Sequence, residues 1–333
     1  MKVGIIGSGI SGLICAYLLR RKCEVTIFES DGKPGGHVNT VVVEGESGSH
    51  KIDTGFIVFN ESNYPNFGRL LEHLEVESQK TRMGFSVRCA QSGIEYSGES
   101  LRGLFGASRN FIDFKHWGMV RDIFRFHSIA KRNQRSQSSV DDFLLKHHFS
   151  QRFRDAFLLP LGSALWSCST ARFGKFPMEF VFDFLSNHKM LQSFDRPIWR
   201  VIKGGSRTYV DEMVKQIGNR LHLNTPVKRV YRTKEGVSLD LQNGTIATFD
   251  EVILACHADQ SLRMIDQPTQ EEKKLLEAFP YEQNLVSLHS DDSLLPHRNS
   301  ARASWNAYLP EGHSEKATVT YDMNILQGLS CSK

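Results

Sequence analysis

The sequence predicts an α/β protein with a parallel sheet and a second, α+β region. Three observations lead to this prediction. A short apolar run at residues 2–6 meets a glycine-rich turn at residues 7–12, and a second apolar run follows at residues 24–28. An acidic residue, Glu29, ends that second run. The chain has 333 residues, which at about 150 residues per domain suggests two domains.

The glycines of the first turn predict a nucleotide site. Gly7 allows a tight turn, Gly9 lets the backbone approach a pyrophosphate, and Gly12 lets the following helix pack close to the sheet. That helix would point its free amide groups at the phosphates. Glu29 lies 22 residues after Gly7, where a carboxylate can accept hydrogen bonds from ribose hydroxyls. Strand, turn, helix, strand and acid occur in order, so we predict a Rossmann-like unit that binds its dinucleotide through Gly7, Ser8, Gly9, Ile10, Ser11, Gly12, Glu29 and Ser30.

The residues after Glu29 bear on which dinucleotide is bound. Gly35-Gly36-His37 follows the acid at the spacing E-x5-GG-(R/H), and this resembles the FAD site of the two-dinucleotide-binding-domain flavoproteins. Asp53-Thr54-Gly55-Phe56 resembles the D-x-G strand that passes close to the flavin in the flavin amine oxidase and carotenoid desaturase superfamily. The resemblance implies FAD, with NAD as the less favoured alternative. His37 stands where many relatives carry Arg, so its phosphate contact would be weaker and pH dependent.

Later segments extend the resemblance over nearly the whole chain. Residues 199–207 resemble the W-x-V-x-GG-S segment that returns the chain to the FAD domain. The resemblance implies that Val227 meets the adenine through its backbone and that Ala255 ends a strand beside the pyrophosphate. With residues 159–167 and 320–324, the pattern is similar to predicted FAD-dependent oxidoreductases often found beside cyclopropane fatty acid synthases.

The motifs also predict a discontinuous domain organisation. We expect an FAD-binding domain from residues 1–75 and 200–260, and a substrate domain from residues 76–199 and 261–333. Relatives continue into a glycine-containing segment that closes over the flavin, and this sequence stops before such a segment. We therefore expect a fragment, an alternative product or a degenerate copy.

Residues 102–155 concentrate positive charge. They hold eleven Lys or Arg and five Asp or Glu, a balance of 11 − 5 = +6, against +4 for the whole chain. Nine Phe or Trp are interleaved, among them Phe111, Phe114, Trp117, Phe124 and Phe126. Such a segment can make peripheral contact with an anionic membrane surface. The alternative, which the sequence favours, places the aromatic residues in the core and the basic face in solvent. We expect no nucleic-acid partner, because no recognisable module surrounds these residues.

Other features suggest a cytoplasmic protein, with membrane contact as the open alternative. The six cysteines lack CxxC spacing and companion histidines, so we expect reduced thiols and no metal site. The most apolar stretch, residues 156–166, is too short to span a bilayer.

The function expected from these features is that of an FAD-dependent oxidoreductase. Flavin N5 would remove a hydride equivalent from a C–H bond of a small apolar substrate. The resemblance implies a fatty acyl or other lipid chain as substrate, and an amine oxidase or carotenoid desaturase-like enzyme is an alternative. A flavin-binding protein without turnover is another. The sequence identifies no catalytic residue, and it leaves open whether four aromatic residues line a pocket or pack in the core: Phe56, Phe59, Trp166 and Tyr321.

Overall fold

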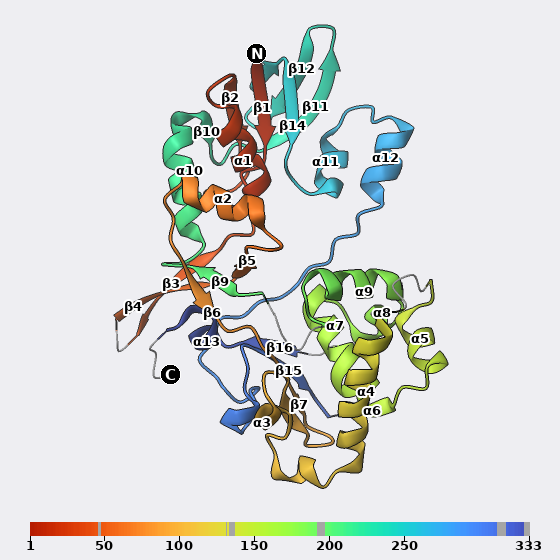
Figure 1. Ribbon diagram of the computed structural model, residues 1–333. Helices are drawn as coiled ribbons and strands as arrows, with labels where there is room; N and C mark the ends of the chain where they lie inside the picture. Colours follow the sequence, from red (N-terminus) through yellow and green to blue (C-terminus); the bar gives the residue numbers. More distant parts are fainter. Residues whose placement is uncertain (46–47, 131, 133–136, 192–196, 312–317, 330–333) are drawn as a thin grey trace.

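The computed structural model describes residues 1–45, 48–130, 132, 137–191, 197–311 and 318–329. Figure 1 shows an upper lobe with a parallel sheet and a lower lobe rich in helices, with short strands between them. Five sheets occur among the described residues.

The upper lobe is built on a four-stranded parallel sheet in the order β10-β2-β1-β14. On one face of this sheet Val3, Ile5, Val25 and Ile27 are at most 2% exposed, and on the other face Ile6 and Phe28 are 5% exposed, as expected for parallel strands covered on both faces. Helix α1 follows β1 and packs against α10. The bounds are β1 Lys2–Ile6, α1 Ile10–Leu19, β2 Glu24–Phe28, α10 Arg207–Ile217, η3 Gly218–Arg220, β10 Leu221–His222 and β14 Glu251–Leu254. This sheet confirms the predicted α/β, Rossmann-like fold class.

An antiparallel sheet, β11-β12-β13, packs against the parallel one through Ile6, Phe28, Leu239 and Phe249. Two helices, α11 and α12, follow β14 and pack against each other. The bounds are β11 Val227–Thr233, β12 Gly236–Leu241, β13 Ile246–Phe249, α11 Ala258–Met264 and α12 Gln270–Glu277.

Short strands lie between the lobes (Figure 1). A hairpin, β3-β4, and a three-stranded sheet, β5-β9-β6, carry the chain from one lobe to the other. Helix α13 contacts β6. The bounds are β3 Thr40–Gly45, β4 Gly48–Asp53, β5 Val58–Asn60, α2 Pro65–His73, β6 Ser78–Thr81, β9 Trp199–Ile202 and α13 Met323–Gln327.

The lower lobe combines a mixed sheet, β16-β15-β7-β8, with a helical layer whose shared core is rich in phenylalanine. Its strands are β7 Phe85–Cys89, β8 Glu95–Ser97, β15 Trp305–Leu309 and β16 Thr318–Tyr321. Its helices are α3 Leu101–Leu104, η1 Ser108–Phe111, α4 Phe114–Ala130, α5 Val140–Lys146, α6 Gln151–Phe153, η2 Arg154–Leu158, α7 Leu159–Trp166, α8 Thr170–Gly174, α9 Met178–Asn187 and η4 Asn299–Ala301.

The division into an FAD-binding and a substrate domain stays a prediction. Its last boundary, at residue 260, falls within α11. That helix contacts β11 of the upper lobe, and Arg229 of β11 pairs with Asp266 at 2.7 Å. Residues just beyond the predicted boundary therefore contact the upper lobe. Among the described helices, none has the length and apolar character needed to cross a membrane.

Candidate functional site

The turn after β1 brings the backbone close to the end of β14. Gly7 has a φ of +102°, and a Cβ there would lie 2.7 Å from the carbonyl oxygen of Ala255. A Cβ on Gly12 would lie 1.9 Å from the carbonyl oxygen of Gly7. A Cβ on Gly9 would meet no atom of the described residues within 4 Å. The fold therefore requires glycine at 7 and 12, whereas Gly9 borders open space at the start of α1.

Glu29, directly after β2, is 8% exposed. Its Oε2 accepts hydrogen bonds from the Ser8 amide at 2.8 Å and the Ser8 hydroxyl at 2.6 Å. Its Oε1 accepts from the Asp31 amide at 3.0 Å and the Ser30 hydroxyl at 3.2 Å. Burial raises the pKa of Glu29, but these hydrogen bonds outweigh burial and hold the pKa below its ordinary value. Glu29 is therefore an anion at neutral pH.

The second glycine-rich loop touches the first. The amide of Gly35 donates to the carbonyl oxygen of Ser8 at 2.9 Å. A Cβ on Gly36, whose φ is +57°, would lie 3.0 Å from the Cα of Gly9. His37 follows, and it is exposed. The two loops that the sequence assigned to one nucleotide site are thus in contact.

Asp53, at the end of β4, is the centre of a buried polar network. Its carboxylate accepts from the Thr40 hydroxyl at 2.5 Å and from the Ser206 amide at 2.9 Å. Its own amide donates to Oε1 of Gln327, in α13, at 2.9 Å. Burial raises the pKa of Asp53 above its ordinary value, although hydrogen bonds from Thr40 and Ser206 act in the other direction. The network joins β3, β4, α10 and α13.

The segment after Asp53 is held tightly against its neighbours. A Cβ on Gly55 would lie 1.9 Å from the carbonyl oxygen of His37. The Thr54 hydroxyl accepts from the side-chain amide of Asn39 at 2.7 Å. The Ser206 hydroxyl donates to the carbonyl oxygen of Phe56 at 2.7 Å. Residues 54–56 are therefore fixed between the His37 loop and the start of α10.

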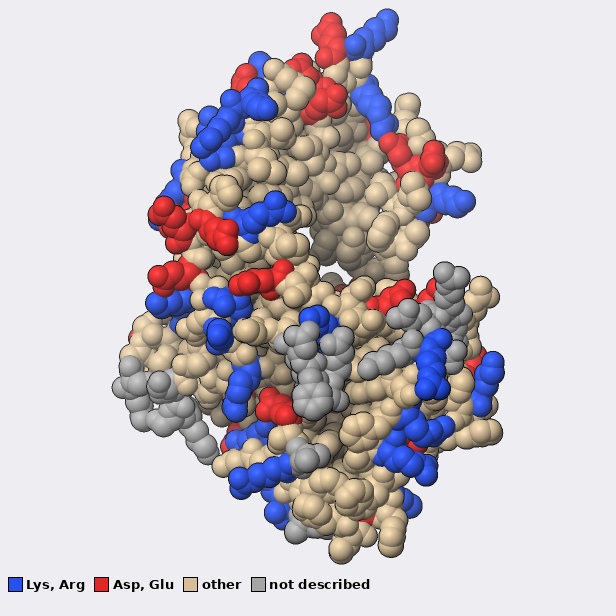
Figure 2. All heavy atoms as spheres, viewed as in Figure 1, with Lys and Arg blue, Asp and Glu red and all other residues tan. Residues whose placement is uncertain are grey.

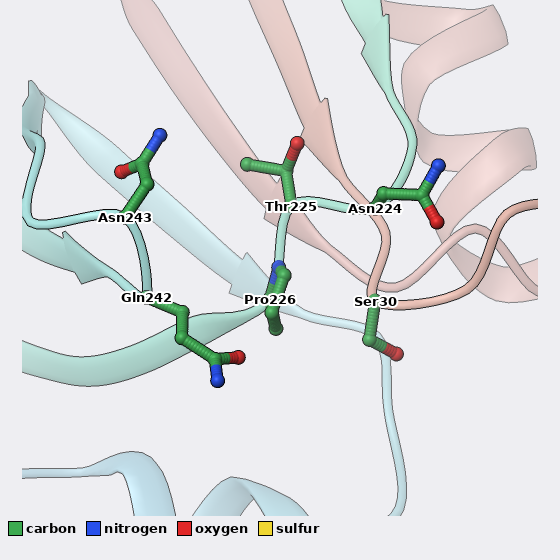
Figure 3. Close-up of a pocket in the computed structure, with 6 residues that line it drawn as sticks. All are labelled: Ser30, Asn224, Thr225, Pro226, Gln242 and Asn243. Atoms are coloured by element: carbon green, nitrogen blue, oxygen red, sulfur yellow. The ribbon is translucent and has the colours of Figure 1, made fainter.

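A cavity of about 410 Å³ opens beside the end of β2 (Figure 3), and we name it the polar cavity because all of its lining residues except Pro226 have polar side chains. Ser30 contributes from the loop after β2, and the turn between β12 and β13 contributes two amide side chains. Its lining residues are Ser30, Asn224, Thr225, Pro226, Gln242 and Asn243. The Thr225 amide donates to the carbonyl oxygen of Glu29 at 2.7 Å, which ties the cavity wall to the acid. Its size lies in the range of small-molecule sites.

The family profile described as "Flavin containing amine oxidoreductase" matches residues 10–287 of this chain. The chain belongs to the flavin-containing amine oxidoreductase family. Membership confirms the predicted superfamily, the oxidoreductase class of its members and FAD as cofactor. The narrower resemblance to proteins found beside cyclopropane fatty acid synthases stays a prediction.

Three proteins similar to this chain show sequence identities between 15% and 25%. Tryptophan 2-monooxygenase of Allorhizobium ampelinum is 25% identical over 296 residues, which cover 76% of this chain and 40% of that protein. Cyclohexylamine oxidase from Brevibacterium oxydans superposes with a TM-score of 0.61 at 16% identity, covering 83% of this chain and 62% of that one. A fatty acid isomerase from P. acnes that produces CLA superposes with a TM-score of 0.58 at 15% identity, covering 83% and 63%. The chain thus spans about two fifths of the curated relative and under two thirds of these two structures.

The predicted cofactor residues of this chain lie mainly along one edge of the parallel sheet. The turn at residues 7–12, Gly35, Gly36 and Ala255 meet there, as their contacts show. Ile10 and Ser11 are exposed in the first turn of α1. Val227 begins β11 directly after Pro226, which lines the polar cavity.

The four aromatic residues considered as pocket lining do not form one group. Phe59 is 1% exposed and packs in the core of the upper lobe, and Phe56 packs partly against the same core. Trp166 packs against the core of the lower lobe. Tyr321 packs edge to face against Trp305. Core packing was therefore the right interpretation for Phe59.

Sequence reasoning missed two rings beside the glycine loops of this family member. The ring of His257 stacks on His37, with centroids 5.3 Å apart, and on Tyr281, with centroids 4.2 Å apart. The Tyr281 hydroxyl accepts from the amide of Ala258 at 3.0 Å. The sequence could have predicted that His257 lies near the site, because this residue follows the strand predicted to end beside the pyrophosphate. The sequence could not have predicted the position of Tyr281, since that position depends on the path of the chain after α12.

Replacing Glu29 with Ala is expected to weaken FAD binding at least tenfold. The substitution would remove the predicted ribose hydrogen bonds, worth about 1.5–3 kcal/mol each, and tenfold corresponds to about 1.4 kcal/mol. Fluorescence titration of the apoprotein with FAD measures the effect. The FAD affinity of Glu29→Gln, which keeps one carbonyl acceptor, should fall between those of the wild type and the Ala variant. An unchanged affinity in the Ala variant would contradict the ribose assignment.

Proposed function

We propose that this protein binds FAD along the edge formed by its two glycine-rich loops and oxidises a C–H bond of a small apolar molecule. One observation carries the proposal: the anionic Glu29 lies beside the open approach at Gly9, at the carboxyl end of a parallel sheet. In open α/β sheets, ligands bind at this end of the strands.

The proposed roles follow from position. Gly7, Ser8, Gly9, Ile10, Ser11 and Gly12 would meet the pyrophosphate, with His37 and Ala255 beside it. Glu29 would hold the ribose, with Ser30 and the polar cavity toward the adenine and Val227 at its wall. Gly35 and Gly36 would keep the second loop close to the first. Thr54, Gly55 and Phe56 would lie toward the flavin ring.

The chemistry divides between cofactor and protein. When bound, the flavin supplies an acceptor for a hydride equivalent. This chain would bind and orient the cofactor, and its apolar surfaces would exclude water from the substrate. The charge of Glu29 and its hydrogen bonds from Ser8 would fix the ribose end before any substrate arrives.

An apolar substrate, such as a fatty acyl chain, is the favoured class. The ring of Trp166 and those of Phe173, Phe176 and Phe184 pack in or against the core of the lower lobe, so they do not distinguish an apolar substrate from an amine. The fold likeness to a fatty acid isomerase is consistent with an apolar substrate. The family description and the likeness to cyclohexylamine oxidase favour the alternative, an amine substrate.

The test begins with the visible spectrum of the purified protein and the nucleotide that it releases on denaturation. Released FAD, and loss of visible flavin absorbance when a fatty acyl substrate is added without oxygen, are the expected results. Loss of absorbance with primary amines alone would establish the amine alternative. Bound FAD that no substrate reduces would favour a flavin-binding protein without turnover, and released NAD would overturn the cofactor assignment.

A further inference from the structure

The outer face of α4 carries large apolar side chains in solvent. Every third or fourth residue along this helix points outward, and we name this set the α4 outer stripe: Phe114, Trp117, Arg121, Phe124 and Ser128. Phe114 is 91% exposed, Phe124 58% and Trp117 47%. The opposite face of the helix, with Met119 and Phe126, is buried. The favoured interpretation from sequence, that the aromatic residues of this region pack in the core, is therefore wrong for the stripe and right for Phe126.

The apolar surface continues beyond the helix. Phe111 is 57% exposed and Ile112 is 80% exposed. The ring of Phe105 packs against both Phe111 and Trp117, each with centroids 4.6 Å apart. The indole N–H of Trp117 donates to the carbonyl oxygen of Phe111 at 2.9 Å. These contacts hold the rings of Phe111 and Trp117 in place at the start of α4. Contiguous exposed apolar surface of this kind marks an interaction site.

The acidic side chains near this apolar surface are neutralised. The Asp122 side chain is fully buried, and its carboxylate accepts from Arg125 at 2.7 Å and from the Ser150 amide at 2.9 Å. Asp113 pairs with Arg152 at 3.5 Å. All residues of α4 are described, and its one acidic side chain, that of Asp122, is buried and paired. The exposed surface of α4 therefore carries no negative charge.

The exposed charged residues of α4 are both basic. They are Lys115 and Arg121, and the Arg121 side chain is 71% exposed and lies 3.6 Å from Asp122. Figure 2 shows the lower end of the molecule, where α3 and the start of α4 lie in Figure 1, as largely uncharged surface with groups of Lys and Arg above it. Apolar rings with a basic border match the boundary of an anionic bilayer, where rings enter the acyl region and cations meet headgroups.

We propose that the α4 outer stripe, with Phe111 and Ile112, docks the protein on a lipid bilayer that contains anionic headgroups. The inference does not depend on the molecule that the flavin oxidises, because it rests on the outer surface of the lower lobe. Protein and nucleic-acid partners can also use exposed aromatic and basic residues, and vesicle binding by the wild type is the result that separates a bilayer from them.

Sedimentation with sucrose-loaded vesicles tests the docking. The full-length protein should bind vesicles of phosphatidylcholine and phosphatidylglycerol, and should bind vesicles of phosphatidylcholine alone at least tenfold more weakly. The double variant Phe114→Ser/Phe124→Ser should bind the anionic vesicles at least tenfold more weakly than the wild type. Both side chains are exposed, so the thermal unfolding midpoint should not change. The matched control is Leu275→Ser on α12 of the upper lobe, whose side chain is 57% exposed, and which should bind like the wild type.

Three results would overturn the proposal. They are an absence of vesicle binding by the wild type, undiminished binding by the double variant, and an equal loss in the Leu275→Ser control.

A second measurement reports how deeply Trp117 enters the bilayer. Brominated acyl chains should quench part of the tryptophan emission of the wild type and less of that of Trp117→Phe; equal quenching would place Trp117 outside the bilayer and contradict the docking geometry. Arg121→Glu should lower binding to anionic vesicles without changing the unfolding midpoint. Unchanged binding would contradict the proposed contact between Arg121 and the anionic headgroups.

Discussion

A Gly9→Ala protein should bind FAD about a hundredfold more weakly than the wild type and unfold at the same temperature. A hundredfold corresponds to about 2.8 kcal/mol. The added methyl group meets no atom of the described protein within 4 Å, so the fold should accept it. The same methyl group would occupy the path by which the pyrophosphate approaches the backbone, and charge-assisted hydrogen bonds of about 1.5–3 kcal/mol each would be lost.

Gly68→Ala is the matched control for this variant. Gly68 lies within α2, and a Cβ there also meets no described atom within 4 Å. Because alanine is the better helix former by about 0.5–1 kcal/mol, this variant should be slightly more stable, and its FAD affinity should equal that of the wild type. Fluorescence titration and thermal unfolding measure both effects. If Gly9→Ala bound FAD as tightly as the wild type, the pyrophosphate would have to lie elsewhere.

Replacing Asp53 with Ala should lower the free energy of unfolding by about 2–4 kcal/mol. The Ser206 amide and the Thr40 hydroxyl both donate to this carboxylate, and a buried donor without an acceptor costs about 1–3 kcal/mol. Asp53→Asn keeps one carbonyl oxygen and should lose less. Urea denaturation of the apoprotein separates this effect from any change in cofactor binding.

Asp211→Ala provides the comparison for Asp53. Asp211 is an exposed acid on α10 that pairs with Arg207 at 2.7 Å. Exposed ion pairs contribute about 0.2–1 kcal/mol, so this variant should remain close to the wild type. Equal losses in the Asp53 and Asp211 variants would mean that the buried network adds nothing to stability beyond a surface pair.

The parts of the site that the sequence predicted are those set by local spacing. The turn at residues 7–12 requires glycine at positions 7 and 12, and the sequence shows glycine at both. The length of α1 sets the number of residues between this turn and Glu29, which follows β2. The contact of Gly36 with Gly9 also follows from the resemblance, because both loops belong to one known arrangement.

The parts that the sequence could not predict depend on segments far apart in the chain. The bond between Asp53 and Gln327 joins residues 274 positions apart, and no periodic pattern indicates such a pair. The same holds for the stacking of the Tyr281 ring on the His257 ring. The aromatic residues of α4 illustrate another limit: phenylalanines occur on both of its faces, and only the packing of the lower lobe decides that Phe126 is buried and Phe124 is not.

The order of strands in the parallel sheet has a consequence for synthesis on the ribosome. β1 and β2 are translated well before their outer neighbours, β14 and β10, which come from residues 251–254 and 221–222. The edge of β2 therefore stays unpaired while some 190 further residues emerge, and the edge of β1 stays unpaired for longer; at about 5–20 residues per second, 190 residues take on the order of 10–40 seconds. Unpaired edges of this kind favour aggregation. We expect production of this protein to depend on chaperones that bind its first strands, and slower translation to increase that dependence.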